Sequence, residues 1–202
     1  MTNTTENTES TILKAAKTVF LKKGMDGARM QEIADEAGIN KALLHYYFRS
    51  KQQLFEAVFL NAFSLLAPQL NDVLNDDSSV QDKIIKFTHN YITFISQHPY
   101  LPNFVIQEIN RNPDFAIQIK ERPQFPDIKK FKTQVDLEVK AGVLKPIKAE
   151  QLFINIMSLS IFPFIGKPLL KAFLNTDENA FSSIIEERKT DVAIFIMNSI
   201  KA

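Results

Sequence analysis

The chain has no cysteine and no tryptophan, and only five glycines among its 202 residues. The lack of cysteine excludes disulfide bonds and thiolate metal sites. The scarcity of glycine, together with the few stretches in which apolar and polar residues alternate, favours an all-α fold. The net charge is +1, so any attraction to nucleic acid has to come from a local patch rather than from the whole molecule.

Signals for export and membrane insertion are also missing. The first ten residues, MTNTTENTES, carry neither the cationic start nor the apolar centre of a signal peptide. The longest apolar run, at residues 161–165, contains Pro163 and is far shorter than the ~20 residues that cross a bilayer. We therefore expect a cytoplasmic protein with no membrane partner, in which the polar residues up to about Asn7 are disordered.

The common patterns of catalytic residues are absent as well. His45, His89 and His98 are far apart and do not have the spacing of metal ligands. There is no glycine-rich phosphate loop, no G-x-S-x-G sequence and no cysteine nucleophile. Glu186 and Glu187 are neighbours, so on a helix they point in different directions. We expect no catalytic site, no metal and no cofactor, which argues against an enzyme.

The most informative stretch runs from Ala28 to Leu54. It begins with an apolar stripe at helical spacing, made of Met30, Ile33, Ala34 and Ala37. Gly38 stands where a chain leaves a helix with positive φ, and Asn40 can cap the next helix, which we expect from about Lys41 to Phe48. Two short helices joined by a tight turn form a helix-turn-helix, whose second helix enters the major groove.

The second of these helices has no negative charge on its outer face. At 100° per residue, the inner face consists of Leu44, Tyr47 and Phe48, and the outer face of Ala42, His45, Tyr46 and Arg49. No Asp or Glu occurs between Gly38 and Lys51. Such a face can lie against phosphates, although a short basic helix on its own is more often an ordinary solvated surface.

The stretch resembles the TetR family of bacterial transcription regulators. The matching positions are Phe20, Gly24, Ile33-Ala34, Ala37-Gly38-Ile39, residues 44–48, Ser50-Lys51 and Leu54. One departure is Arg29, which stands where the family often has a Ser or Thr cap and which could reach a phosphate instead. The resemblance implies a homodimer on a palindromic DNA operator, a larger helical domain that binds a small-molecule effector, and a phosphate contact by Tyr47.

We expect residues 8–53 to form the DNA-binding domain. A lysine can donate to guanine, small apolar groups can touch the thymine methyl, and a glutamine can bond an adenine edge or a phosphate. The candidate DNA contacts are Arg29, Gln31, Lys41, Ala42, Leu43, His45, Tyr46, Tyr47 and Lys51.

Residues 54–202 are expected to form the larger helical domain. The predicted helix caps are Thr8, Ser50, Ser78 and Thr176. Pro68 is expected to kink or end the long helix that starts after Ser50. The prolines between residues 113 and 127 argue against continuous helix there, and Gly166 with Pro168 marks a turn.

TetR-like proteins pair through their last two long helices into a four-helix bundle. The candidates for this contact are Leu152, Ile156, Leu159, Ile184, Arg188, Val192 and Phe195, some of which must fill the chain's own core instead.

Seventeen phenylalanines are a high number for this length, and they lead us to expect a hydrophobic effector. Each of them could equally be an ordinary core residue. The candidate effector contacts are Phe87, Tyr91, Phe94, Phe104, Glu108, Phe131, Phe153 and Phe162. We interpret the chain as a DNA-binding transcription regulator, a repressor rather than an activator. The alternatives are a helical interaction module without DNA binding and an enzyme.

Overall fold

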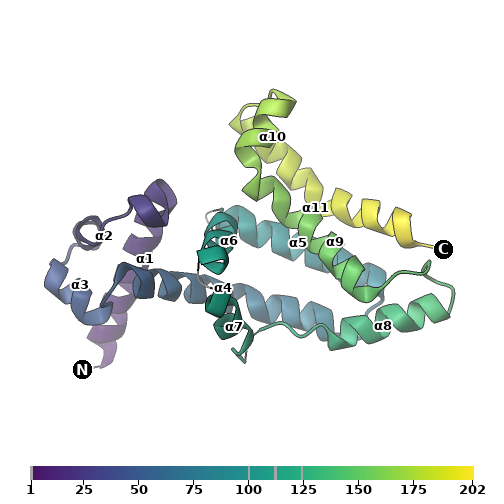
Figure 1. Ribbon diagram of the computed structural model, residues 1–202, viewed down its shortest axis with the longest axis horizontal. Coiled ribbons are helices and arrows are strands. Elements are labelled where there is room, and N and C mark those ends of the chain that lie inside the picture. The colour runs from purple at the N-terminus through teal and green to yellow at the C-terminus, as the bar shows by residue number, and fades with distance from the viewer. Residues whose placement is uncertain (1, 100, 112, 124) are drawn as a thin grey trace.

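The computed structural model describes residues 2–99, 101–111, 113–123 and 125–202, and for residues 2–6, 104, 107–109, 111, 115 and 116 it describes the backbone alone. The described residues form helices joined by turns and loops, with no strand among them, as expected for an all-α fold. A small N-terminal bundle lies at one end of the molecule and a larger helical body at the other, and a single long helix joins them (Figure 1). The bundle and the joining helix comprise α1 (Thr2–Gly27), α2 (Met30–Glu36), α3 (Lys41–Tyr47) and α4 (Lys51–Asn75).

The N-terminal bundle has its own apolar centre. Ile12 and Phe20 of α1 are buried together with Ile33 of α2 and Leu44 of α3. The ring of Phe20 lies 4.5 Å from the ring of Phe55 in α4, measured between centroids. The start of α4 therefore belongs to the core of the bundle, while its later turns pack against α5.

The first helix starts earlier than the sequence predicted. Its residues from Thr2 onward are helical, and the Thr11 hydroxyl donates to the Asn7 carbonyl at 2.8 Å. The predictions of a disordered segment up to Asn7 and of a cap at Thr8 were therefore wrong. Gly24 interrupts α1, because this glycine has φ 67° inside the helical span.

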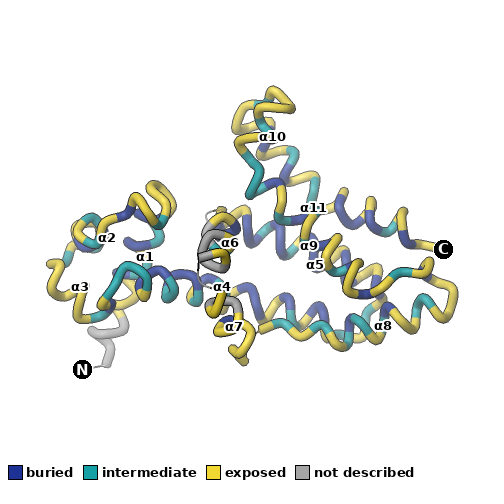
Figure 2. Tube along the Cα trace, viewed as in Figure 1, coloured by how far each residue is buried: buried dark blue, intermediate teal, exposed yellow. Residues whose placement is uncertain are grey.

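The body is arranged around α5 (Val80–Gln97), which packs against α4, α8, α9 and α11. The buried residues of α5 include Ile84, Phe87, Ile92 and Ile95. Figure 2 shows buried residues running along α4 and α5. The other helices are α6 (Leu101–Arg111), α7 (Pro113–Lys120), α8 (Lys129–Lys140), α9 (Ala149–Ile165), α10 (Lys167–Leu174) and α11 (Glu178–Ile200).

Proline ended fewer helices than expected. The long helix α4 continues through Pro68 to Asn75, because the neighbouring Leu66, Ala67 and Leu70 are buried and hold the segment in place. Residues 113–120 form α7 with Pro113 at its first position, where proline costs no hydrogen bond. Residues 167–174 form α10 instead of a simple turn, with Pro168 in the first turn.

Two predicted caps are displaced by one residue. The N-cap of α5 is Ser79, whose hydroxyl accepts from the Asp82 N–H at 3.1 Å, while Ser78 bonds to the Asp76 carboxylate. The N-cap of α11 is Asp177, which accepts from the Ala180 N–H at 2.8 Å. Ser50 caps α4 as predicted, accepting from the Gln53 N–H at 3.1 Å. Neighbouring Ser, Thr and Asp residues offer similar caps, so spacing alone does not choose between them.

A buried lysine caps the C-terminal end of α4. The side chain of Lys83 is fully buried, and its ammonium donates to the carbonyls of Val73, Leu74 and Asp76 at 2.8, 3.1 and 2.8 Å. It also pairs with the Asp76 carboxylate at 2.7 Å, which holds the pKa of that carboxyl well below its usual range. Lys83 therefore satisfies helix-terminal carbonyls that have no partner within α4 itself.

By length and composition alone, α4 is apolar enough to cross a bilayer, with a mean hydropathy of 1.2. The bent pair of α9 and α10 passes the same test. Ten residues of α4 are buried within this chain, and the core helix of a globular protein has the same apolar composition.

Candidate nucleic-acid interface and effector cavity

The turn between α2 and α3 has the geometry that the sequence predicted. Gly38 has φ 67°, a conformation that glycine adopts without strain. The Asn40 side chain accepts from the Leu43 N–H at 2.7 Å and so caps α3. At the start of α2, where a hydroxyl cap is missing, the Arg29 backbone N–H donates to the Glu32 carboxylate at 3.3 Å. Lys23 pairs with Glu32 at 2.8 Å and lowers its pKa.

The two faces of α3 differ sharply in burial. Leu44 is fully buried and Phe48, the residue at its C-terminus, is buried beside it. On the opposite side Ala42 and His45 are exposed, and Tyr46 has 79% of its surface exposed. Helix α3 lies at the outer end of the bundle, far from the body, and most of it is coloured as exposed in Figure 2. The outer face is therefore open to a large partner.

The predicted DNA contacts gather on α2, α3 and the start of α4. Lys41, Leu43 and Arg29 are exposed, and Gln31 is exposed with its amide donating to Asp35 at 2.8 Å. Tyr47 is half-buried, and its ring meets that of Tyr46 edge-on at 5.5 Å.

Lys51 differs from the other predicted contacts. Its side chain is half-buried, and its ammonium donates to the carbonyls of Ala28 at 3.0 Å and Asp26 at 3.3 Å. It therefore ties the start of α4 to the segment between α1 and α2. A phosphate contact by Lys51 stays a prediction, as do the other DNA contacts.

A cavity of about 340 Å³ lies inside the body. Its walls come from α4, α5, α6 and α9 and from the segment before α8. The described lining residues are Phe59, Phe63, Leu66, Leu70, Leu74, Phe87, Tyr91, Phe94, Ile95, Leu101, Pro102, Val105, Phe125, Pro126, Ile128, Phe153, Met157 and Ile161. No charged residue is among them, so this part of the wall suits an uncharged molecule.

Tyr91 carries the one hydroxyl among these described lining residues. Its ring stacks on Phe87 at 5.6 Å between centroids, and burial raises the pKa of its phenol. The phenol is therefore a neutral hydrogen-bonding group inside an apolar wall, which is the composition typical of small-molecule sites.

The predicted effector residues divide into three groups. Phe87, Tyr91, Phe94 and Phe153 line the cavity. Phe131 is buried behind the lining, with its ring 6.3 Å from that of Phe153, and Phe162 is exposed outside the cavity. The side chains of Phe104 and Glu108 lie outside the described part of the chain.

The prediction missed the wall that α4 contributes. This wall is Phe59, Phe63, Leu66, Leu70 and Leu74. These five residues follow one helical stripe, so the sequence did contain a signal. The same stripe also fits an ordinary core helix, so the sequence alone does not distinguish a cavity wall from a packed core.

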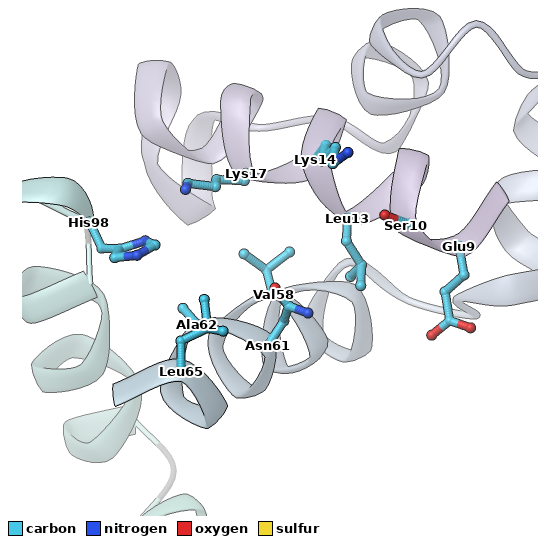
Figure 3. A pocket seen from close by; sticks show the side chains of 10 residues that line it. All are labelled: Glu9, Ser10, Leu13, Lys14, Lys17, Val58, Asn61, Ala62, Leu65 and His98. Atoms are coloured by element: carbon cyan, nitrogen blue, oxygen red, sulfur yellow. The ribbon is translucent and has the colours of Figure 1, made fainter. Parts of the chain in front are cut away.

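A second hollow, of about 400 Å³, lies where the bundle meets the body (Figure 3). Its lining residues are Glu9, Ser10, Leu13, Lys14 and Lys17 of α1, Val58, Asn61, Ala62 and Leu65 of α4, and His98 at the end of α5. The His98 ring lies 4.4 Å from that of Phe94, which lines the effector cavity. Burial, aided by the charge of Lys17, lowers the pKa of His98. His98 thus lies between the cavity wall and α1.

Three of the predicted dimer residues are not available to a partner. Leu152, Ile156 and Val192 are buried in the chain's own core, because α9 and α11 both pack against α5 on that side. The other candidates remain accessible: Leu159, Ile184 and Arg188 are partly buried, and Phe195 is 65% exposed.

The bundle has the architecture of a helix-turn-helix DNA-binding module, and comparison with known proteins agrees. The family described as "Bacterial regulatory proteins, tetR family" matches residues 12–58. The HTH-type transcriptional repressor NicS of Pseudomonas putida is 32% identical over 97 residues, which are 46% of this chain and 44% of NicS. The HTH-type transcriptional activator FasR of Mycolicibacterium smegmatis is 24% identical over 151 residues, 74% of this chain and 67% of FasR.

A solved structure shares the fold of most of the chain. The crystal structure of a mutant HlyIIR protein aligns with 92% of this chain and 98% of its own, with a TM-score of 0.62 and 27% sequence identity. Residues 12–58 of this chain thus match the TetR family, and the comparisons identify the chain as a DNA-binding transcription regulator. Regulators of this family bind DNA and small-molecule effectors and work as dimers.

Proposed function

We propose that the outer face of α3 reads base edges in the major groove of a palindromic operator. Lys41 donates to guanine, Ala42 and Leu43 touch thymine methyl groups, and His45 and Tyr46 bond to neighbouring bases. Arg29, Gln31 and Tyr47 hold the phosphates, with Lys51 next to them. The observation that carries this proposal is the exposure of Tyr46, His45 and Ala42 on a capped helix without carboxylates.

In this proposal the protein acts as a cytoplasmic homodimer. A single helix-turn-helix makes few contacts, whereas two reading helices about 34–36 Å apart engage successive turns of the duplex. Residues 8–53 form the DNA-binding domain in this proposal, and residues 54–202 bind the effector and the second protomer. The accessible apolar surface of α9 and α11, including Leu159 and Phe195, supports pairing through these helices.

The effector in this proposal is a small, uncharged and largely hydrophobic molecule that releases a repressor from DNA. The cavity supports this chemistry, since its described wall is apolar and offers the phenol of Tyr91 as a hydrogen-bonding group. Phe59 and Leu66 of α4 line the cavity, while Phe55 of the same helix packs in the bundle. If α4 can take two positions, a ligand that binds the protein more tightly in one of them shifts the population of molecules towards that conformation.

His98 provides a second connection between the two parts. Its ring contacts Phe94 of the cavity wall, and it borders the hollow beside Lys17 of α1. A ligand that moves Phe94 therefore also moves His98 and changes the packing between His98 and α1. We propose that both routes alter the spacing of the two reading helices in the dimer.

An electrophoretic mobility shift tests the DNA-binding proposal. The probes are the DNA upstream of the chain's own gene and a shuffled fragment of equal length and composition. We expect the upstream fragment to be retained at lower protein concentration than the shuffled one. Equal retention of both fragments would favour a non-specific binder, and no retention would favour a helical interaction module.

Thermal unfolding with a panel of metabolites tests the effector proposal. We expect uncharged lipophilic compounds to raise the midpoint of unfolding, because they bind the folded chain only. The stabilising compounds should also release the retained DNA. Stabilisation by charged, polar compounds alone contradicts the proposed effector class, and tighter retention of DNA would indicate an activator or a corepressor.

A further inference from the structure

Helix α10 exposes apolar side chains to solvent, which is the reverse of an ordinary surface helix. Its lysines Lys167 and Lys171 both pair with Glu178 at the start of α11, the second at 2.9 Å. Its apolar residues Leu169, Phe173 and Leu174 are 56%, 78% and 53% exposed. No residue of α10 is buried. Lys167 and Lys171 thus hold the helix to its own chain together with Leu170, which packs against the core, while Leu169, Phe173 and Leu174 face outward.

A solvated helix normally shows the reverse arrangement, with its apolar stripe against the core. Exposed apolar patches of this kind commonly mark a surface that another molecule covers. Helix α10 protrudes from the body next to the adjoining ends of α9 and α11 (Figure 1), and Figure 2 shows most of it as exposed.

A hollow of about 490 Å³ lies beside α10. Its lining includes Leu159, Phe162 and Pro163 of α9, Leu170 of α10 and Arg188 of α11. Leu159 also borders a groove between α9 and α11 that Phe195 lines. The hollow is therefore continuous with the α9–α11 surface through which the dimer is proposed to form.

The hydrogen bonding of Arg188 is a separate indication that a second molecule completes the wall of this hollow. Its Nη2 donates to the Leu159 carbonyl at 2.6 Å, while its buried Nε finds no acceptor among the described residues. Burial lowers the pKa of the guanidinium. A guanidinium carries five donor hydrogens, so a second molecule that supplies acceptors here would satisfy a group that is already partly desolvated.

We propose that α10 docks on a second copy of this chain, with Phe173 of each protomer entering the partner's hollow beside Leu159 and Phe162. A contact between identical chains related by a two-fold axis has to be self-complementary. This surface meets that condition, because the projecting Phe173 and the apolar hollow lie on adjacent parts of it. The inference rests on the proposed dimer and extends it beyond α9 and α11.

Sedimentation velocity over a dilution series tests the inference with two variants. Phe173→Ser removes the projecting ring, and the control Leu137→Ser removes another exposed apolar side chain, 58% exposed, from α8. Each dimer contains two copies of Phe173, so we expect Phe173→Ser to raise the dimer Kd about 100-fold. Leu137→Ser should leave the Kd within about twofold. Circular dichroism at high concentration checks that both variants keep the helical fold.

The absence of cysteine allows a second measurement. A Phe173→Cys variant carries a single thiol, whose reaction with a charged maleimide should be slow above the dimer Kd and fast below it. If the parent stays monomeric at every concentration, both the dimer and the α10 contact are wrong. If the parent dimerises and Phe173→Ser does so equally well, only the α10 contact is wrong. Binding of the parent, but not of Phe173→Ser, to phosphatidylglycerol vesicles with unchanged dimerisation would assign α10 to a lipid surface and also overturn it.

Discussion

The two ends of the molecule use aromatic side chains in opposite ways. In the bundle, Tyr46 projects from α3 with 79% of its surface exposed. In the body, Phe87 and Tyr91 are buried and face a cavity. The first feature is a surface made by one short helix, whereas the second is a space enclosed by several helices. A side chain on the surface can be changed without disturbing the fold, but each residue of the cavity wall is also part of the core.

The difference predicts where substitutions are costly, and the largest effect is expected in the body. Lys83→Met keeps the length of the side chain but leaves the carbonyls of Val73, Leu74 and Asp76 without their donor. Breaking such a buried charged network costs about 3–5 kcal/mol, which we expect as the loss in free energy of unfolding in urea. Lys86→Met is the control, because Lys86 is exposed and pairs with the same Asp76. A loss from Lys83→Met no larger than that of the control would contradict the role of Lys83.

The second prediction separates the cavity from the reading surface. Ile161→Trp places a larger side chain in the wall of the cavity. We expect it to weaken binding of an uncharged lipophilic dye such as Nile red by at least tenfold, about 1.4 kcal/mol, and to leave binding to operator DNA unchanged. Fluorescence titration measures the first and gel retardation the second. Undiminished dye binding would show that ligands of this class bind elsewhere.

A smaller effect is expected in the bundle. Asn40→Ala removes the acceptor that caps the Leu43 N–H at the start of α3. Loss of an N-cap costs about 1 kcal/mol, and we expect this loss in thermal stability together with weaker DNA binding. Asn198→Ala, at an exposed position inside α11, is the control and should change neither. Unchanged DNA affinity in Asn40→Ala would mean that the turn does not need this cap.

The smallest effect concerns the junction of the two parts. The pKa of His98 is lowered in the folded chain, so the unfolded chain takes up the proton more readily. The free energy of unfolding should therefore fall as the pH drops below about 6.5 towards the folded-state pKa. Lys14, Lys17 and Glu9 are the other charged side chains among the described residues that line the same hollow.

Thermal unfolding between pH 7.5 and 5 measures this effect. His98→Gln should remove this part of the pH dependence, and His89→Gln, at an exposed histidine on α5, should retain it. A parent protein whose stability does not change over this range would contradict the role of His98.

The same comparison explains what could be predicted from the sequence. Gly38, Asn40 and the two faces of α3 follow from spacings within fifteen residues, and the structure has them as predicted. The wall formed by Phe63 and Leu70 could not be separated from an ordinary core stripe, since a cavity depends on the distance between helices.

Long-range partners explain the other differences. In the sequence, Lys83 looks like an ordinary solvent-exposed lysine, because its partners at the end of α4 are known only from the structure. The proline-containing helices α7 and α10 were missed because proline at the start of a helix and proline in a turn look alike in sequence.

The central claim is that the outer face of α3 reads DNA, and a footprinting titration of the Lys41→Ala, Tyr46→Ala double variant tests it most directly. Each specific base contact contributes about 1–3 kcal/mol, so we expect the double variant to protect the operator about 100-fold more weakly than the parent, with an unchanged circular dichroism spectrum. Lys140→Ala, which removes an exposed lysine from α8, should footprint like the parent. If the double variant instead protects the same bases at the same concentration as the parent, α3 is not the reading helix.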